Sequence, residues 1–146
     1  MSEFIIRPYH KDDCNSVIQL WSECGLIFPQ NNPERDIERK LKVNPEWFLV
    51  GEIEGRIVAS CMAGYEGHRG WINYLAVSPK YRRKGLAAKI MQEAEHKLRD
   101  AGCPKINIQI RTSNIDVIKF YKEVGFKEDD VVSMGKRLVI DNNSEN

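Results

Sequence analysis

Three consecutive cations open a predicted helix near the middle of the chain, in the run Tyr81 to Lys89, YRRKGLAAK. The N-terminus of a helix carries partial positive charge and free N–H donors, so acidic residues and Ser, Thr or Asp caps are normally found there. Gly85 permits a positive φ or a close approach of a ligand to the backbone. A bound polyanion such as a pyrophosphate would compensate this charge, and the alternative is a solvated cationic turn.

Four cations surround the expected anion site, at Lys80, Arg82, Arg83 and Lys84. The run contains neither GxxxxGK[ST], the phosphate loop of many nucleotide hydrolases, nor GxGxxG, the dinucleotide-binding fingerprint. Because it follows a predicted strand and begins a predicted helix, its consecutive N–H groups could point into one concavity. The sequence therefore predicts a local phosphate-binding loop of another type.

The charge balance of the whole chain limits its partners. The chain has 146 residues, with 22 Lys and Arg against 21 Asp and Glu, and a net charge of +1. This balance removes the overall basic footprint of nucleic-acid and anionic-membrane binders. We therefore expect no nucleic acid and no membrane as partners. The remaining alternative is a phosphate-reading interaction domain that uses only Lys80 to Lys84.

Length and hydropathy predict one domain over residues 1–146, with a core over about 4–140 and a frayed polar tail over 141–146. No apolar run reaches membrane-spanning length, and the N-terminus MSEFIIRPYHKDD shows no secretory signal. We therefore expect a cytoplasmic protein. The cysteines and histidines lack the spacing of metal ligands, so we expect no metal site.

Hydrophobic periodicity predicts the elements that must position the basic run. Alternating or β-branched segments predict strands at Phe4 to His10, Trp47 to Glu52, Arg56 to Tyr65, Trp71 to Val77, Lys105 to Ile110, Phe126 onward and Val131 to Ile140. Apolar residues at helical spacing predict helices after a cap at Asp12 or Asp13, at Glu34 to Val43, at Gly85 to Ala101 and at Ile115 to Val124. A strand meander followed by alternating helices and strands indicates an α/β fold, a mixed sheet with helices on both faces.

Two motifs in the second half of the chain carry a family resemblance. Arg82-x-x-Gly85-x-Ala87 resembles the R/Q-x-x-G-x-G/A motif of the GNAT superfamily, the acyl-CoA-dependent N-acetyltransferases. Asn114 to Phe126, NIDVIKFYKEVGF, is similar to the N-x-x-A-x-x-F/L-Y-x-x-x-G-F helix of that family, with Val117 in place of its small residue. The segments NYLAVSPKYRRKGLAAKIM and IIRPYHKDD also resemble family segments, so the likeness extends from about Phe4 to Ile140. It implies a mostly antiparallel central sheet that splays between two strands.

This resemblance implies an acyltransferase that moves an acetyl group from acetyl-CoA to a primary amine of a small molecule or protein, by direct transfer in a ternary complex. The cofactor-binding residues that it implies are Leu75, Ala76, Val77, Arg82, Arg83, Lys84, Gly85, Leu86, Ala87, Ala88, Asn114 and Tyr121. In the family, the strand before the loop pairs its backbone with the pantetheine arm. Here that strand is Asn73 to Val77, and Leu75 and Val77 would make those contacts through main-chain atoms. Without the resemblance, their apolar side chains indicate ordinary core positions.

Tyr121 is the catalytic side chain that the resemblance implies. A thiolate leaves more easily if a nearby acid protonates it, and tyrosine, with a pKa of about 10, suits an alkyl thiolate of similar basicity. Asn114 lies two helical turns earlier and would share its face, although an asparagine there could equally cap the helix. Without the resemblance, a packed helical tyrosine is the simpler interpretation of Tyr121.

The general base and the acceptor are less defined. Many family members place a glutamate where this chain has Trp71, which cannot take a proton. Glu66 is our candidate for a catalytic base, with His68 beside it, and deprotonation through water or an amine that arrives neutral are the alternatives. By analogy Leu26 to Pro33, with the charged helix that follows, would line the site of the unknown amine acceptor, where Phe28, Asn31 and Asn32 are chemically mixed.

Two further possibilities follow from the same residues. Because the strand carboxylate is missing, the chain could be a non-catalytic acyl-CoA-binding regulatory module instead of an enzyme. The predicted late strand Val131 to Ile140 offers an edge that could pair with another chain, so a homodimer is possible.

Overall fold

The computed structural model describes residues 2–141. Its five-stranded sheet has the order β1-β2-β3-β4-β5. The strands are β1 Phe4–Pro8, β2 Phe48–Ile53, β3 Arg56–Tyr65, β4 Gly70–Val77 and β5 Ile106–Asn107. Neighbouring strands are antiparallel from β1 to β4, whereas β4 and β5 run parallel. The mixed, mostly antiparallel sheet expected from the sequence is confirmed.

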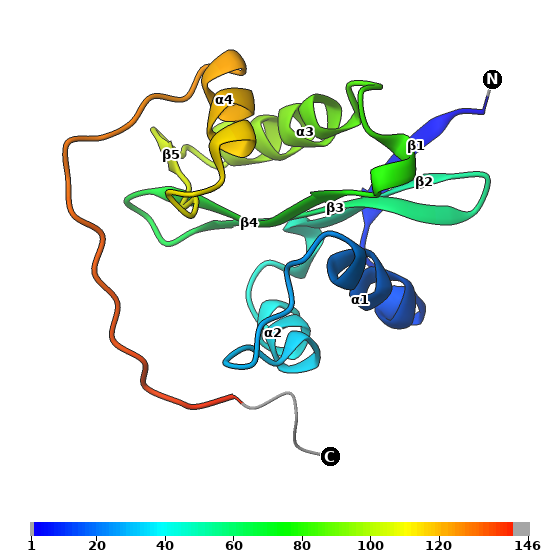
Figure 1. The fold of residues 1–146 in the computed structure, drawn as a ribbon, viewed down its shortest axis with the longest axis horizontal. Helices are drawn as coiled ribbons and strands as arrows, with labels where there is room; N and C mark the ends of the chain where they lie inside the picture. Colours follow the sequence, from blue (N-terminus) through cyan, green and yellow to red (C-terminus); the bar gives the residue numbers. More distant parts are fainter. Residues whose placement is uncertain (1, 142–146) are drawn as a thin grey trace.

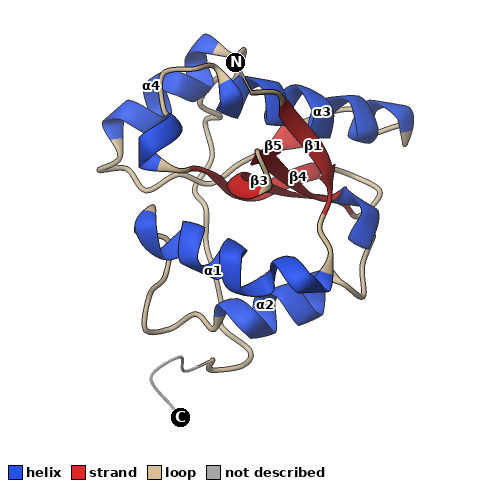
Figure 2. Cartoon of the chain, turned by 90° about the vertical axis from the view of Figure 1, so that its right-hand side faces the viewer, coloured by secondary structure: helices blue, strands red, loops and turns tan. Residues whose placement is uncertain are grey.

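Helices cover both faces of this sheet. They are α1 Cys14–Glu23, α2 Pro33–Lys40, α3 Leu86–Asp100 and α4 Ile115–Glu123, with short 3-10 turns at Lys11–Asp13, Pro45–Trp47 and Pro79–Tyr81. α1 and α2 lie against one face, and α3 and α4 lie against the other (Figure 1, Figure 2). Within residues 2–141, none of these helices has the length and apolar character needed to cross a membrane.

The sheet separates two hydrophobic cores. On one face, α3 contributes Ile90, Met91 and Leu98, all fully buried, to a core that also holds Tyr121 of α4. On the other face, Trp21 of α1 packs with Phe48 and with Ile37 of α2. Alternation along β2 and β3 supplies both cores, because successive side chains of a strand point to opposite faces.

The first helix begins differently from our expectation. Neither Asp12 nor Asp13 caps α1 with its side chain; instead His10 caps the preceding 3-10 turn, and Asp13 completes a capping box by accepting the His10 N–H at 2.8 Å. Asp13 also forms an ion pair with Arg7 at 2.9 Å. The carboxylate expected to cap α1 therefore ties β1 to the turn before that helix.

The predicted strands after α4 do not form. Residues 126–141 contain no strand, and every residue from 127 to 140 is exposed. This segment leaves α4, runs outside the sheet and ends beside α2 (Figure 1). β-branched residues give a strand only when a neighbouring strand supplies hydrogen bonds, and here none lies alongside.

Two other expectations change near the end of the chain. Lys105 to Ile110 shortens to Ile106–Asn107, because β5 pairs with β4 at only two positions. Asp141, which we assigned to the frayed tail, is 3% exposed and accepts hydrogen bonds from Arg39. The rest of the predicted tail, residues 142–146, lies outside the described residues.

Candidate active site

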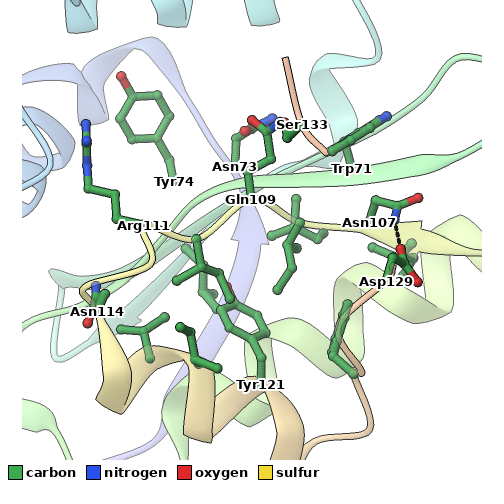
Figure 3. A pocket seen from close by; sticks show the side chains of 18 of the residues that line it. Trp71, Asn73, Tyr74, Asn107, Gln109, Arg111, Asn114, Tyr121, Asp129 and Ser133 are labelled. Atoms are coloured by element: carbon green, nitrogen blue, oxygen red, sulfur yellow. Dashed lines mark hydrogen bonds between the residues drawn. The ribbon is translucent and has the colours of Figure 1, made fainter. Parts of the chain in front are cut away.

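A large cleft opens where β4 and β5 separate. It has a volume of about 1800 Å³ and is lined by β4, β5, α4, the loop after α1, the start of α2 and residues 131–135. Tyr74 and Asn73 point to one side of the two strands, whereas Tyr121 approaches from α4 on the other (Figure 3). The cleft thus passes through the plane of the sheet and joins its two faces.

A β-bulge in β4 shapes the centre of this cleft. Ser60 pairs with Ala76 and Met62 with Asn73, so β4 has one residue more than β3 across this interval. Tyr74 takes up the extra length with a φ of 53°, a left-handed conformation that is uncommon for a residue with a side chain. The Ser60 hydroxyl donates to the Tyr74 carbonyl at 2.7 Å and accepts from Trp21 Nε1 at 2.9 Å. The bulge is therefore anchored from the α1 side.

Beyond the bulge, one edge of β4 is open. β5 pairs only with Gly70 and Trp71, so Asn73 to Val77 have no strand on that side within the described residues. Among the residues proposed for the pantetheine arm, Leu75 lines the cleft, whereas the side chains of Ala76 and Val77 are buried in the two cores. The side chains of Asn73 and Tyr74 line the cleft as well, beside this unpaired edge of the main chain. Contact of this stretch with a pantetheine arm stays a prediction.

The loop before α3 presents free N–H donors. Gly85 is the N-cap of α3 with a φ of 76° and Arg83 has a φ of 65°, so two residues of this short loop are left-handed. The first helical hydrogen bond runs from Lys89 N to the Gly85 carbonyl, and the first turn has no acidic residue and no side-chain cap. The N–H groups of Leu86, Ala87 and Ala88 are thus available to an anion.

The cations of this loop divide into two groups. Arg82 turns back and donates from Nε to the Val77 carbonyl at 3.2 Å, and its Nη2 lies 3.6 Å from Cys24 Sγ. Its side chain therefore clamps the end of β4 to the loop. Within residues 2–141, Lys80, Arg83 and Lys84 form no ion pair, and Arg83 and Lys84 are exposed beside the helix N-terminus.

Tyr121 lies at the floor of the cleft. It is 7% exposed, and its ring packs edge-on against Phe120 and Phe126 with centroids 5.3 Å apart in each case. Burial raises the pKa of its hydroxyl, and the neighbouring Cys61 thiol adds to this effect. Because its pKa is raised, the phenol remains protonated at neutral pH. The aromatic contacts hold its ring in one place.

Asn114 occupies the N-cap position of α4, but its side chain makes no capping hydrogen bond. It lines the same cleft as Tyr121. The sequence leaves two roles open for Asn114, a helix cap and a cofactor contact. The structure shows no capping hydrogen bond, and the cofactor contact stays a prediction.

Glu66 and His68 do not line the cleft. They lie exposed in the β3–β4 turn, where Glu66 accepts the backbone N–H groups of His68 and Arg69, each at 2.7 Å. These hydrogen bonds lower the Glu66 pKa. Trp71, at the position of the family glutamate, does line the cleft and is 37% exposed.

A polar cluster lies on the α1–α2 side, where the sequence places the acceptor, but Tyr74, Asp36 and Arg111 are not among the residues singled out from the sequence. The Tyr74 hydroxyl donates to Asp36 Oδ2 at 2.6 Å and also hydrogen-bonds Asn31. Burial, reinforced by Asp36, raises the pKa of this phenol. On the same cleft, the Arg111 guanidinium stacks over the Phe28 ring at 4.3 Å. The available signal was weak, because Asp36 is one of three acidic residues in the charged helix α2.

Among the described residues, no three His, Cys, Asp or Glu side chains gather as they would around a metal ion.

Comparison with known proteins gives a consistent result. Residues 14–126 match the model of the Acetyltransferase (GNAT) family. An acetyltransferase of Yersinia pseudotuberculosis is 48% identical over 136 residues, which are 93% of this chain and 96% of the relative. An acetyltransferase of Pectobacterium atrosepticum is 46% identical over 136 residues, with the same coverage.

Solved structures show the same fold. Ard1 from Thermoplasma volcanium superposes with a TM-score of 0.78 at 23% identity, covering 85% of this chain and 82% of that one. AAC(6')-Iy, in complex with the bisubstrate analogue CoA-S-monomethyl-acetylneamine, superposes with a TM-score of 0.76 at 18% identity, covering 93% and 99%. The expected enzyme class, an acyltransferase, is confirmed by the family match and the named relatives. The chain belongs to the acetyltransferase (GNAT) family.

Proposed function

We propose that this protein transfers an acetyl group from acetyl-CoA to a primary amine, by direct attack of the amine in a ternary complex. Three features carry the proposal: the N–H groups at the start of α3, the edge of β4 that has no strand beside it within residues 2–141, and the buried Tyr121. Leu75, Asn114 and Tyr121 line the cleft, whereas the residues from Arg82 to Ala88 are not among those that line it.

The loop from Arg82 to Ala88 holds the pyrophosphate. Its N–H groups point to one side of a helix N-terminus, where the helix dipole favours negative charge. Arg83 and Lys84 add attraction, because neither has an acidic partner among the described residues. Arg82 contributes its backbone, while its side chain holds the loop against the end of β4.

The main chain of Leu75 to Val77 pairs with the amide groups of the pantetheine arm, as an added strand pairs with a sheet edge. The bulge at Tyr74 keeps this edge away from β5 and leaves room for the arm. Asn114 can donate to the same ligand from α4, because its amide is not used as a cap.

Tyr121 acts as the general acid. The thioester supplies the acetyl group, and its sulfur leaves as a thiolate when the new amide bond forms. The Tyr121 hydroxyl hydrogen-bonds this sulfur and donates its proton as the thiolate leaves. Burial raises the pKa of the phenol, and the same buried surroundings make a thiolate beside it more basic, so the proton can still be transferred. The proton released by the attacking amine leaves through water, because Glu66 lies outside the cleft.

Asp36 receives the acceptor. It is a carboxylate on the acceptor side of the cleft, its side chain is 26% exposed, and Tyr74 fixes its position. A carboxylate placed there attracts a protonated amine and orients it toward the thioester. The ammonium group loses one proton to water before it attacks, and the nitrogen loses a second one when the amide bond has formed. A cytoplasmic location stays a prediction.

Thermal unfolding with acetyl-CoA, dephospho-CoA and ATP tests the cofactor step. Acetyl-CoA at about a hundredfold over its Kd should add about 2.7 kcal/mol to the free energy of unfolding. Thiol release with a panel of small amines and peptides then tests transfer. Stabilisation without thiol release for any amine would favour a binding module, and no stabilisation by acetyl-CoA would overturn the proposal.

A further inference from the structure

A guanidinium without a counter-ion lines the acceptor side of the cleft. Arg111 belongs to the connection between β5 and α4, and its Cζ lies 4.3 Å from the centroid of the Phe28 ring, which comes from the loop after α1. Apart from this contact, the Arg111 side chain has no hydrogen-bond or ion-pair partner within residues 2–141. A cation that faces a cleft in this way can bind an anionic group of a ligand.

The pattern of the residues before Arg111 explains the side that it faces. Three alternating isoleucines within residues 106–110 pack on the core beside α3 and α4, so the side chains between them point to the opposite face of the extended chain. Arg111 continues this alternation. Figure 3 shows it on the same side of the strands as Tyr74, with Tyr121 on the other side. The guanidinium therefore lies on the side of the cleft that we assign to the acceptor.

The Phe28 ring gives the guanidinium a platform. The Phe28 side chain is half-buried, and Arg111 lies over the face of its ring. A guanidinium carries its N–H donors in a planar fork, and contact with an aromatic face leaves donors of that fork available. Such a fork matches the two oxygens of a carboxylate in a bidentate pair.

An opposite charge lines the same side of the cleft. Asp36 accepts from the Tyr74 hydroxyl at 2.6 Å, and it is the carboxylate to which we assign the ammonium group of the acceptor. The ion-pair partner of Asp36 is Arg39 at 3.5 Å, and Arg39 binds Asp141 more closely, at 2.6 Å. Asp36 and Arg111 form no ion pair with each other. The cleft thus presents a carboxylate and a guanidinium that are held apart.

We infer that the acceptor is an amine that also carries a carboxylate, and that Arg111 determines this specificity by binding the carboxylate. The inference rests on the proposed acetyl transfer, because the amine end of the same molecule occupies the Asp36 site. Two opposite charges held apart match the two ends of an amino acid. They also match a peptide N-terminus that is followed by an acidic residue. An amine without an anionic group leaves the Arg111 charge without a partner and is therefore a poorer acceptor.

The cofactor is the other source of anionic groups. In the proposed binding mode its pyrophosphate lies at residues 82–88, which do not line this cleft. Its thioester lies beside Tyr121, on the side of the strands away from Arg111. The anion that meets Arg111 therefore belongs to the acceptor.

Binding is measured first, because it does not require acetyl transfer. We would titrate the CoA-loaded protein by NMR with ω-amino acids of increasing chain length, each beside its primary amide, which keeps the shape without the carboxylate charge. We expect at least one amino acid to bind about tenfold more tightly than its amide. A dipeptide amide with aspartate in second place, compared with its asparagine counterpart, tests the peptide source. A preference for the acid in either kind of pair supports the inference, whereas equal affinities in every pair, or no binding at all, would overturn it.

Substitutions assign the preference to one side chain. Arg111→Gln should weaken binding of the acids alone, so that acid and amide bind equally, with the Kd of acetyl-CoA unchanged. Arg111→Lys keeps the charge without the planar fork and should recover part of the preference. Arg99→Gln removes an exposed cation that lines the same cleft from α3, and it should behave like the parent. A preference that survives Arg111→Gln, or a loss of acetyl-CoA affinity in place of acid affinity, would contradict the inference.

Thiol release with the same pairs separates this inference from the proposed function. Carboxylate preference in binding without thiol release would support the Arg111 site and overturn the transfer. Thiol release with equal kcat/KM for acids and amides would support the transfer and overturn the role of Arg111.

Discussion

The Ser60 hydroxyl donates a hydrogen bond to the Tyr74 carbonyl at 2.7 Å and thereby secures the bulge from beneath the sheet. Ser60 is fully buried and accepts from Trp21 Nε1 in turn, so one hydroxyl connects α1, β3 and β4. A left-handed residue in the middle of a strand is costly and persists only when its surroundings hold it. Ser60 is the polar part of that support, and the Trp21 ring, stacked on Tyr74 at 3.8 Å, is the apolar part.

Ser60→Ala should therefore destabilise the fold and weaken cofactor binding together. It leaves a buried N–H and a buried carbonyl without a partner, at a cost of about 1 to 3 kcal/mol for each such group. Urea unfolding measures the first effect and acetyl-CoA titration the second. Ser16→Ala, at an exposed position of α1, is the matched control and should change neither. Loss of stability with unchanged acetyl-CoA affinity would show that the bulge does not serve the cofactor.

Tyr121→Phe should lower kcat by about a hundredfold, the lower end of the range for general acid catalysis. The ring contacts with Phe120 and Phe126 survive, so the Kd of acetyl-CoA and the melting temperature should change little. Steady-state kinetics and calorimetric titration measure the two quantities. Tyr65→Phe, at a tyrosine outside the cleft, is the control. An unchanged kcat removes Tyr121 from the mechanism.

The pH profile gives a second test of this residue. Because burial raises the Tyr121 pKa above its ordinary value of about 10, the acid form should persist throughout the neutral and mildly alkaline range. Tyr121 should therefore cause no fall in kcat between pH 7 and about pH 10. A basic limb inside that interval that disappears in Tyr121→Phe would contradict the assigned pKa direction.

Asp36→Asn should raise the KM of a cationic acceptor more than it lowers kcat. The substitution keeps an acceptor for the Tyr74 hydroxyl but removes the charge that attracts an ammonium group. We expect a loss of about tenfold in kcat/KM, equivalent to about 1.4 kcal/mol, with the KM of acetyl-CoA unchanged. Glu34→Gln, in the first turn of the same helix and outside the cleft, controls for charge. Equal losses in both variants would exclude a local role.

Arg83→Ala should weaken acetyl-CoA binding in a salt-dependent way. Its side chain is exposed and has no ion-pair partner among residues 2–141, so its removal leaves no buried charge behind. An exposed cation next to a pyrophosphate contributes long-range attraction that salt screens, since the Debye length is about 10 Å at 0.1 M. The Kd of acetyl-CoA should be higher for the variant than for the parent at low salt, and the two Kd values should converge at high salt. Arg56→Ala, at an exposed arginine outside the cleft, should behave like the parent.

Asp13→Asn should lower stability at neutral pH by about 2 kcal/mol, the scale of a hydrogen bond to a charged group. The Arg7 guanidinium, the main cause, holds the Asp13 pKa below its usual range. A depressed carboxyl pKa stabilises the fold above the unfolded-state pKa, and this contribution is lost as the pH falls through the folded-state value. Thermal unfolding from pH 7 to pH 2 should show parent and variant converging in acid. Asp12→Asn, with a side chain 84% exposed, should follow the parent throughout.

Elements that depend on local pattern could be predicted well. The strand Arg56–Tyr65 is observed with the predicted bounds, and the helix expected from Gly85 to Ala101 forms over Leu86–Asp100. In both, the hydrophobic period, the flanking turn residues and the burial agree. The sequence also allowed a positive φ at Gly85, and the structure shows one at the start of α3, where no side chain caps the helix.

Features that depend on distant partners could not be predicted. Tyr74 gives no sign that it adopts a positive φ, since that conformation is imposed by Ser60 and Trp21 from other elements. The contact of Tyr74 with Asp36 spans 38 residues of sequence. Val131 to Ile140 has strand-like composition, but the sequence does not say whether a neighbouring strand exists.

The two hydrophobic cores have a consequence for how this enzyme can change. Within residues 2–141, no buried side chain belongs to both cores, because the sheet lies between the layer of α3 and α4 and the layer of α1 and α2 (Figure 2). When two substituted residues share no contacts, their effects on the free energy of unfolding are additive. The two layers still communicate at one place, because Trp21 of α1 reaches the β4 bulge through Ser60 and through its ring contact with Tyr74. Substitutions in α2 that avoid this contact should therefore leave the packing of α3 and α4 unchanged, whereas substitutions at Trp21 should not.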